Sequence, residues 1–465
     1  MTGTDRLETG MHIDALQGRS SGSLTSFKSP PVVRRRLAGG GQLLLAENHV
    51  VPMVHLICAM PAGGQHDPDG KAGLATLTTQ LLREGTTRRD IAWLARELEG
   101  RGADLLPRVD WEVGSLAIEA LSTDLEMVVD TLVDLVTAPV FPAAAVEGIT
   151  RRQIAKLRQH RWQPRNLANH WLLRGVFDGT VYDRSLFGDE TSLGSIGRGD
   201  LIAFHRAHYR PADAVWVMVG GFSIEEWDRR LASRLPRDDR PSRGDQPYIE
   251  SPARAVTPDR GRRVMLVASS RARQTELRLG LPGLPRTDPD FTALRLVAEI
   301  LGQRLDRILR ERQGATYGVR VGVEGRRGPG PFGISLALPH ERVNGAIRTI
   351  CDEVDRMGRE PVDHAELDEA RHGVIGSYLR SLVTIQGLAR RLERQAVDQL
   401  PDDHDRRWLD RLTQLGRDAL QQVAARHVDA ERLSIVAVGP TQILHPTLMS
   451  HGEVDVIRPA TGDPA

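Results

Sequence analysis

Apolar positions in the first part of the chain change from a strand pattern to a helix pattern. Residues 54–60 form a mostly apolar run ending at Pro61, which is typical of a buried strand. A glycine-rich turn with acidic residues follows over 63–70. Leu74, Leu77 and Leu81 then recur at helical spacing, which predicts a core-facing helix closed by Gly85.

The same reading, continued along the first half, predicts a mixture of strands and helices. Alternating or buried apolar runs predict strands at residues 41–46, 50–60, 113–118 and 214–219. Periodic apolar positions predict helices at residues 90–101, 125–136, 143–161, 163–176 and 194–209. Residues 1–30 are polar and predict a flexible leader, whereas residues 237–262 are rich in Pro, Arg, Asp and Ser and predict a linker.

The segment after this linker repeats the segment before it. Gly197 matches Gly416 and His208 matches His427, both 219 residues apart, and Met60-Pro61 matches Leu281-Pro282 at 221. Two copies of one unit explain a nearly shared offset better than an array of three or more repeats. We therefore predict an α+β fold with two homologous domains, residues 31–236 and 263–455, followed by a tail over 456–465. Each domain is expected to be a mainly antiparallel sheet with helices packed on it.

Composition narrows the function classes. The chain has 62 basic and 61 acidic residues, a net charge of +1, so nothing points to nucleic acid or a membrane surface. Its two cysteines exclude a disulfide framework or a Cys-based zinc knuckle. No run has the length of a membrane-spanning helix and no secretory signal is visible, so a cytoplasmic protein is expected.

The strand, turn and helix over residues 54–86 resemble the zinc-site region of the M16 (pitrilysin-type, inverzincin) metallopeptidases. In that family H-x-x-E-H directly follows the Gly-Leu-Ala that opens the helix; the two His bind zinc and the Glu activates water. The matching positions here are Thr76, Thr79 and Gln80. Two hydroxyls and an amide cannot replace two imidazoles and a carboxylate. The resemblance therefore implies an M16-type scaffold, two domains enclosing a clam-shell chamber, that binds no metal itself.

The third zinc ligand of the family, a Glu on a later long helix, is also missing. The corresponding position falls near Lys156, and no carboxylate occurs between Glu147 and Asp178. Lys156 either places an ammonium where the metal would lie or is a solvated helical lysine.

The second half carries a positive signal. Residues 309–319, LRERQGATYGV, resemble the M16 segment in which an Arg and a Tyr reach a peptide bound at the zinc of the other half. The matching residues are Arg310 and Tyr317. An Arg offers a fixed fork of donors to a peptide carbonyl, and a Tyr hydroxyl can donate to an oxyanion. The alternative is a helix-terminal Arg on a polar face and a Tyr that begins a strand. The glycine-rich residues 322–333 lack the Lys of a P-loop and predict a hairpin turn.

Together these features predict a non-catalytic subunit of a bacterial heterodimeric M16-type zinc peptidase. A homologous partner with H-x-x-E-H would hold the zinc, while this chain would contribute Arg310, Tyr317 and chamber wall to peptide processing. A purely structural or peptide-binding scaffold is the first alternative. A self-sufficient hydrolase with a zinc site built from scattered His is the second; His205 and His208, for example, are three residues apart on a predicted helix.

Overall fold

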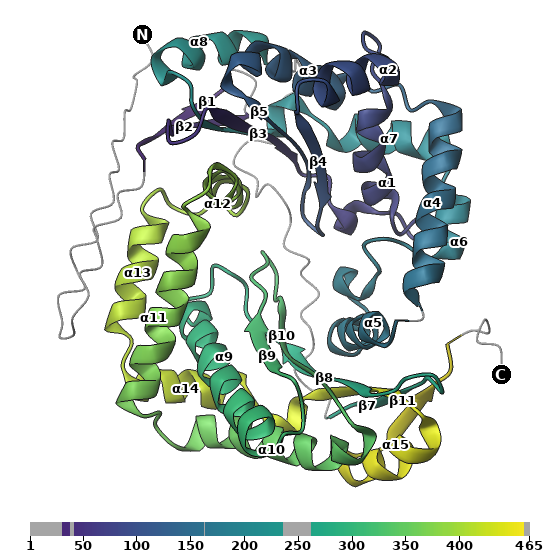
Figure 1. Cartoon of the computed structure of the whole chain (residues 1–465), viewed down its shortest axis with the longest axis vertical. Helices are drawn as coiled ribbons and strands as arrows, with labels where there is room; N and C mark the ends of the chain where they lie inside the picture. The colour runs from purple at the N-terminus through teal and green to yellow at the C-terminus, as the bar shows by residue number, and fades with distance from the viewer. Residues whose placement is uncertain (1–29, 38–40, 162, 236–261, 460–465) are drawn as a thin grey trace. The chain divides into compact units, whose positions relative to one another are not determined.

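The computed structural model describes residues 30–37, 41–161, 163–235 and 262–459 of the 465-residue chain. The chain forms two compact units, and Figure 1 labels most of their helices and strands. Unit 1 takes its residues from 1–154, 186–250 and 377–406, and unit 2 from 155–185, 251–376 and 407–465. Each unit is therefore assembled from both halves of the sequence. Apart from residues 30 and 262, the predicted leader and linker lie outside the described residues.

A mixed six-stranded sheet forms the centre of unit 1. Its strands are β1 (Val32–Arg36), β2 (Gln42–Glu47), β3 (Met53–Met60), β4 (Asp104–Val109), β5 (Gly114–Leu121) and β6 (Val215–Gly220). The order is β1-β2-β6-β3-β5-β4, and every neighbouring pair is antiparallel except β2 and β6. β3 and β6 are buried along nearly their whole length, as expected for strands covered on both faces.

Unit 2 repeats this arrangement. Its strands are β7 (Val264–Ala268), β8 (Thr275–Pro282), β9 (Val319–Val323), β10 (Pro331–Leu338), β11 (Ser434–Gly439) and β12 (Val454–Ile457), in the order β12-β7-β11-β8-β10-β9. β7 is parallel to both β11 and β12, and the remaining neighbours are antiparallel. β9 and β10 pair as the hairpin predicted around the glycine-rich segment, which confirms that prediction.

The predicted duplication is visible in the five shared strands. β2-β6-β3-β5-β4 of unit 1 corresponds in order and direction to β7-β11-β8-β10-β9 of unit 2. β6 begins at Val215 and β11 at Ser434, which are 434 − 215 = 219 residues apart, the offset found in the sequence. The units differ in the sixth strand, because β1 is antiparallel to its neighbour whereas β12 is parallel to its own.

Helices cover both faces of each sheet. Those of unit 1 are α1 (Leu74–Leu81), α2 (Ile91–Leu94), α3 (Leu125–Thr137), α6 (Glu190–Ser195), α7 (Arg198–His208), α8 (Ile224–Arg234) and α12 (Ile385–Val397). Those of unit 2 are α5 (Pro164–Phe177), α9 (Phe291–Leu305), α10 (Val343–Arg359), α14 (Arg417–His427) and α15 (Thr441–Leu448). Three further helices each contain one of the positions where the chain passes from one unit to the other, namely α4 (Ala143–Arg161), α11 (His364–Ser381) and α13 (His404–Gln414).

One face of each sheet is covered by a helix from the other half of the sequence. In unit 1, α12 packs on β6 and β3, and its Leu388 and Leu392 are buried in one cluster with Ile57 and Val217. Each such buried apolar side chain stabilises the fold by about 1.5–3 kcal/mol.

The reciprocal helix in unit 2 is α5, which packs on β8 and β11 (Figure 1). The approach is close, since a Cβ on Gly280 would lie 3.2 Å from the Leu172 methyl groups, and one on Gly175 would lie 2.3 Å from Met265 Cε. α5 and α12 thus occupy corresponding places in the two units, and each closes the core built by the other half.

Some local predictions are wrong. The single helix predicted over residues 194–209 is two helices, α6 and α7. Gly197 between them is extended, and its N–H donates to the Asp200 carboxylate (2.8 Å), which caps the start of α7. The strand predicted from Val50 begins only at Met53, because Val50 and Val51 lie in an exposed turn. β1 and β4 were not predicted. Within the described ranges, no helix is long and apolar enough to cross a membrane.

The exchange of α5 and α12 predicts that neither half of the chain folds alone. A fragment of residues 1–236 lacks α12, and a fragment of residues 262–465 lacks α5, so each leaves one sheet face uncovered. We expect each fragment to aggregate or to unfold without a cooperative transition in circular dichroism, and the two expressed together to recover the transition of the intact chain. A cooperative transition in the isolated 1–236 fragment would contradict this expectation.

Candidate functional site

The helix with the predicted zinc-motif positions, α1, begins at a rigid turn. The Asp67 carboxylate accepts hydrogen bonds from Gly73 N and Ala75 N, both 2.7 Å long, which satisfies two amides at the helix start. Gly73 has a φ of +93°, and a Cβ there would lie 2.9 Å from Leu193 Cδ2. Glycine is therefore required at this position. The turn fixes which residues of α1 point into the protein.

Thr76 and Thr79 point into the core of unit 1 and are 3% and 0% exposed. Thr76 Oγ1 donates to the Leu186 carbonyl (2.6 Å). Thr79 Oγ1 donates to the Ala75 carbonyl (2.9 Å) and lies 2.7 Å from the Tyr209 hydroxyl, which then donates to it. Gln80 is half-buried. Both hydroxyls thus have intramolecular partners.

Space around Thr79 is already filled. A Cβ on Gly114 would lie 2.8 Å from the Tyr209 hydroxyl and 2.9 Å from Thr79 Oγ1. Burial raises the pKa of Tyr209, so its hydroxyl stays protonated and serves as a donor. Hydroxyls bonded to carbonyls are poor ligands for zinc, which prefers imidazole, thiolate and carboxylate. These residues do not fit a zinc ion, and the described part of the chain contains no group of three His, Cys, Asp or Glu that could hold a metal.

Lys156 is exposed on α4, in the part of that helix that belongs to unit 2. No ion pair links it to another residue of the described ranges, which is the arrangement of a solvated helical lysine.

Arg310 and Tyr317 lie in one segment of unit 2. Arg310 is in a wide helical turn, Asp306–Arg312, that continues α9, and its guanidinium is held by Asp306 (3.1 Å) and Glu311 (3.2 Å). Asp306 also accepts from Val319 N (3.0 Å), which ties the turn to the start of β9. The guanidinium is therefore placed beside the hairpin while its side chain stays about half exposed.

The loop before β9 presents Tyr317 to solvent. Thr316 Oγ1 donates to the Ala337 carbonyl on β10 (2.7 Å), and Gly314 has a φ of +58° that permits the tight turn. Tyr317 is 90% exposed, although a tyrosine commonly buries much of its ring. An anchored loop with an exposed aromatic residue at its tip is a typical contact site for another molecule.

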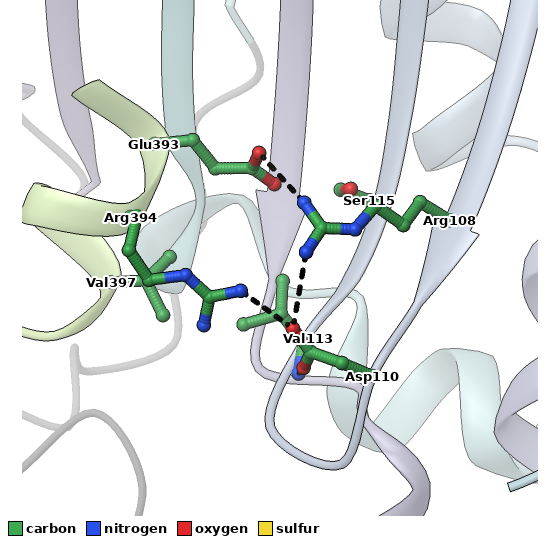
Figure 2. Close-up of a pocket in the computed structure, with 7 residues that line it drawn as sticks. All are labelled: Arg108, Asp110, Val113, Ser115, Glu393, Arg394 and Val397. Atoms are coloured by element: carbon green, nitrogen blue, oxygen red, sulfur yellow. Dashed lines mark hydrogen bonds and ion pairs between the residues drawn. The ribbon is translucent and has the colours of Figure 1, made fainter. Parts of the chain in front are cut away.

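A small pocket between the β4–β5 hairpin and α12 is filled by ion pairs rather than by space for a ligand (Figure 2). Its cavity volume is about 10 Å³, room for one water molecule. Asp110 accepts from Arg394 (3.0 Å) and from Val113 N (2.7 Å), while Glu393 accepts from Arg390 (3.1 Å). Burial alone would lower the pKa of Arg394, but nearby carboxylates, Asp110 foremost, raise it overall. The pairs hold α12 against the sheet.

Sequence reasoning missed two residues of this region, Asp67 and Tyr209. Asp67 is predicted only as part of an acidic turn; an acidic residue six positions before the N-cap Gly73 lies outside the usual capping position, so its role depends on how the turn folds back. Tyr209 likewise carries no local signal, because only the fold brings it to Thr79, 130 residues earlier.

Comparison with family models places both halves of the chain in one family of peptidase-like proteins. Residues 43–190 match the model described as insulinase (peptidase family M16), and residues 195–374 match the one described as peptidase M16 inactive domain. The chain belongs to the M16 family. Since α1 has no H-x-x-E-H, the chain is an inactive M16-like peptidase homologue.

The names of the relatives that match this chain include a protease, a peptidase subunit and a non-peptidase homolog. An uncharacterized zinc protease of Streptomyces coelicolor is 21% identical over 81% of this chain and 83% of its own. A non-peptidase homolog of Helicobacter pylori is 25% identical over 45% of this chain and 48% of its own. A probable mitochondrial-processing peptidase subunit beta of Arabidopsis thaliana is 21% identical over 82% of this chain and 73% of its own.

A solved structure has the same fold. The peptidase M16 inactive domain of Pseudomonas fluorescens covers 88% of this chain and 98% of its own, with a TM-score of 0.78 and 26% identity. Two M16-type domains, each a mixed sheet with packed helices, are therefore the architecture of this chain.

The Thr79–Tyr209 hydrogen bond predicts a stability effect. In Thr79→Val the buried Tyr209 hydroxyl loses its partner, so we expect the free energy of unfolding to fall by about 1–3 kcal/mol. Thr79→Ser keeps the hydroxyl and should stay near the original stability. Thr78→Val is the matched control, because the Thr78 hydroxyl bonds only its own helix, at the Leu74 carbonyl. Urea unfolding measures all three, and equal stability of Thr79→Val and the original chain would contradict the role of this bond.

Proposed function

We propose that this chain is the non-catalytic subunit of a heterodimeric M16-type zinc peptidase. The observation that carries the proposal is a contrast within one chain. Two of the three predicted zinc-motif positions are occupied by buried, hydrogen-bonded threonines, whereas the Arg310–Tyr317 segment is anchored and exposed. A chain that served only as a scaffold would have no need to hold that loop in one conformation around an exposed tyrosine.

The names of relatives support a paired arrangement. The Arabidopsis thaliana relative is described as a subunit of mitochondrial-processing peptidase, and a relative from Bos taurus as subunit 1 of the cytochrome b-c1 complex. We infer that this chain likewise pairs with a homologue, one that retains H-x-x-E-H and holds the zinc. A purely structural role, without a part in catalysis, is the alternative.

The chemistry of the two residues suits a substrate held at a partner's zinc. The Arg310 guanidinium, oriented by Asp306 and Glu311, can offer its remaining N–H groups to a peptide carbonyl. The Tyr317 hydroxyl could donate a hydrogen bond to an oxyanion that develops on that carbonyl, where a partner's zinc would supply the activated water. Neither residue can start the reaction alone, because neither activates water.

Mixing this chain with its H-x-x-E-H homologue tests the proposal. We expect peptide cleavage only in the mixture, with kcat/KM reduced about 100-fold by Arg310→Ala or Tyr317→Phe, the typical loss for one transition-state donor. Arg312→Ala, an exposed arginine two residues from Arg310, is the matched control and should leave cleavage unchanged.

Two outcomes would contradict this function. Cleavage by this chain alone would mean that it is a self-sufficient hydrolase. If the mixture cleaves peptide equally well with either substitution, the chain has the purely structural role. Size-exclusion chromatography of each variant with the homologue separates a lost donor from a lost complex, since only the second changes the elution volume.

A further inference from the structure

Unit 2 carries a row of polar residues on the sheet face that α5 partly covers. In the strand register, Arg278 on β8 lies opposite Ser335 on β10, and Ser335 lies opposite Arg320 on β9. Neighbouring strands are about 4.8 Å apart, so the Cα atoms of the two arginines are separated by about 10 Å across this row. α5 covers the β8 end of the row, whereas Arg320 at the β9 end is exposed.

α5 adds a third arginine to the same place. Arg278 Nε donates to the Asn169 side chain on α5 (2.7 Å). Arg165 lies four residues before Asn169 and so on the same face of the helix, one turn away. Arg165 is exposed, as is Arg320.

The positive charge of this cluster is only partly balanced. Arg278 is 4% exposed and donates to Glu276 (2.9 Å) and to the Leu277 carbonyl (2.9 Å). Burial lowers the pKa of Arg278, Glu276 opposes this, and the charges of Arg165 and Arg320 lower it further. Neither Arg165 nor Arg320 has an ion-pair partner among the residues that the structure describes. Among the described residues, Glu276 is the carboxylate that an ion pair links to this cluster, through Arg278.

On the same face, the next row consists of glycines where it crosses β8, β10 and β9. Gly280, Gly333 and Gly322 are aligned in register across β8, β10 and β9. A Cβ on Gly322 would meet no atom within 4 Å. β9 is also the last strand of its sheet. Leu172 of α5 lies against Gly280 and Gly333, so the uncovered backbone is at Gly322. Together with the exposed Arg320 on the same strand, it leaves a surface at the sheet edge along which an extended chain can lie.

We propose that this surface, the arginine shelf of Arg165, Arg278, Arg320, Ser335 and Gly322, binds an acidic peptide segment in extended conformation. Alternate side chains of an extended peptide lie on one side about 6.5–7 Å apart, a spacing that two long arginine side chains can meet. Guanidinium groups bind carboxylates through paired, charge-assisted hydrogen bonds. Arg278 is a positioning residue, because its donors are already used within the fold, and Arg165 and Arg320 make the contacts.

The inference rests on the proposed function only in that it names the kind of peptide the subunit would take. The isolated chain is enough to measure it. If the mixture with a homologue does not cleave peptides but the arginine shelf still binds them, only the proposed function is contradicted. If the mixture cleaves peptides but the arginine shelf does not bind the acidic peptide, only the binding proposal is contradicted.

Fluorescence anisotropy with a labelled peptide of alternating Glu and Ala residues tests the shelf. We expect Arg320→Gln and Arg165→Gln each to raise Kd about tenfold, a loss typical of one charge-assisted contact. Arg359→Gln is the matched control: this arginine is exposed on α10 and paired with Asp355, so Kd should not change. Gly322→Val keeps the charge but places a branched side chain on the uncovered backbone at Gly322, and should also raise Kd.

Three results would overturn the proposal. The peptide with Gln in place of Glu could bind equally well, which would remove the role of carboxylates. Arg359→Gln could weaken binding as much as Arg320→Gln, which would indicate attraction to net charge alone. Inorganic phosphate at 10 mM (about the concentration of a common buffer) could displace the peptide at constant ionic strength, which would indicate a general anion site.

Discussion

The covering of each sheet by a helix from the opposite half of the sequence is the constraint on which the rest of this structure depends. α12 buries Leu388 and Leu392 on β3 and β6, and α5 buries Leu172 on β8. The two units are therefore joined in folding, because completing one core requires the chain of the other. A duplicated sequence would otherwise be expected to give two independent domains.

The same exchange explains why the polar residues of the two sheet faces lie where they do. The ion pairs of Arg394 with Asp110 fix the end of α12 against the β4–β5 hairpin, and the bond from Arg278 to Asn169 fixes α5 on β8. Such buried or half-buried pairs add little net stability, but they exclude other placements of the helix. In unit 2, α5 packs on β8 and β11, and Arg320 on the edge strand β9 stays exposed.

Much of this fold is predictable from the sequence, for reasons that particular elements make clear. α4 was predicted with its observed bounds, residues 143–161, because a long periodic run between Pro142 and Pro164 has clear ends. The duplication was predictable because both copies retain Gly197 or Gly416 before the same helix. β4 was missed because Asp104–Val109 contains Pro107 and is an edge strand, whose exposed positions weaken the apolar alternation. The exchange of helices leaves no trace in a local pattern, since α5 and α12 are apolar on one face wherever they dock.

The residues at the zinc-motif positions of α1 are packed into the core of unit 1, although the fold around them is that of the M16 family. Thr79 is completely buried, and its hydroxyl, the Tyr209 hydroxyl and the backbone at Gly114 fit closely together. A glutamate at that position would need room that Tyr209 occupies and would place a charge in a site with no cation. Converting α1 to H-x-x-E-H would therefore take changes on β5 and at the end of α7 as well as on the helix. The threonines are best understood as parts of a repacked core, which means that any chemistry of this chain has to come from its exposed residues and not from a restored metal site.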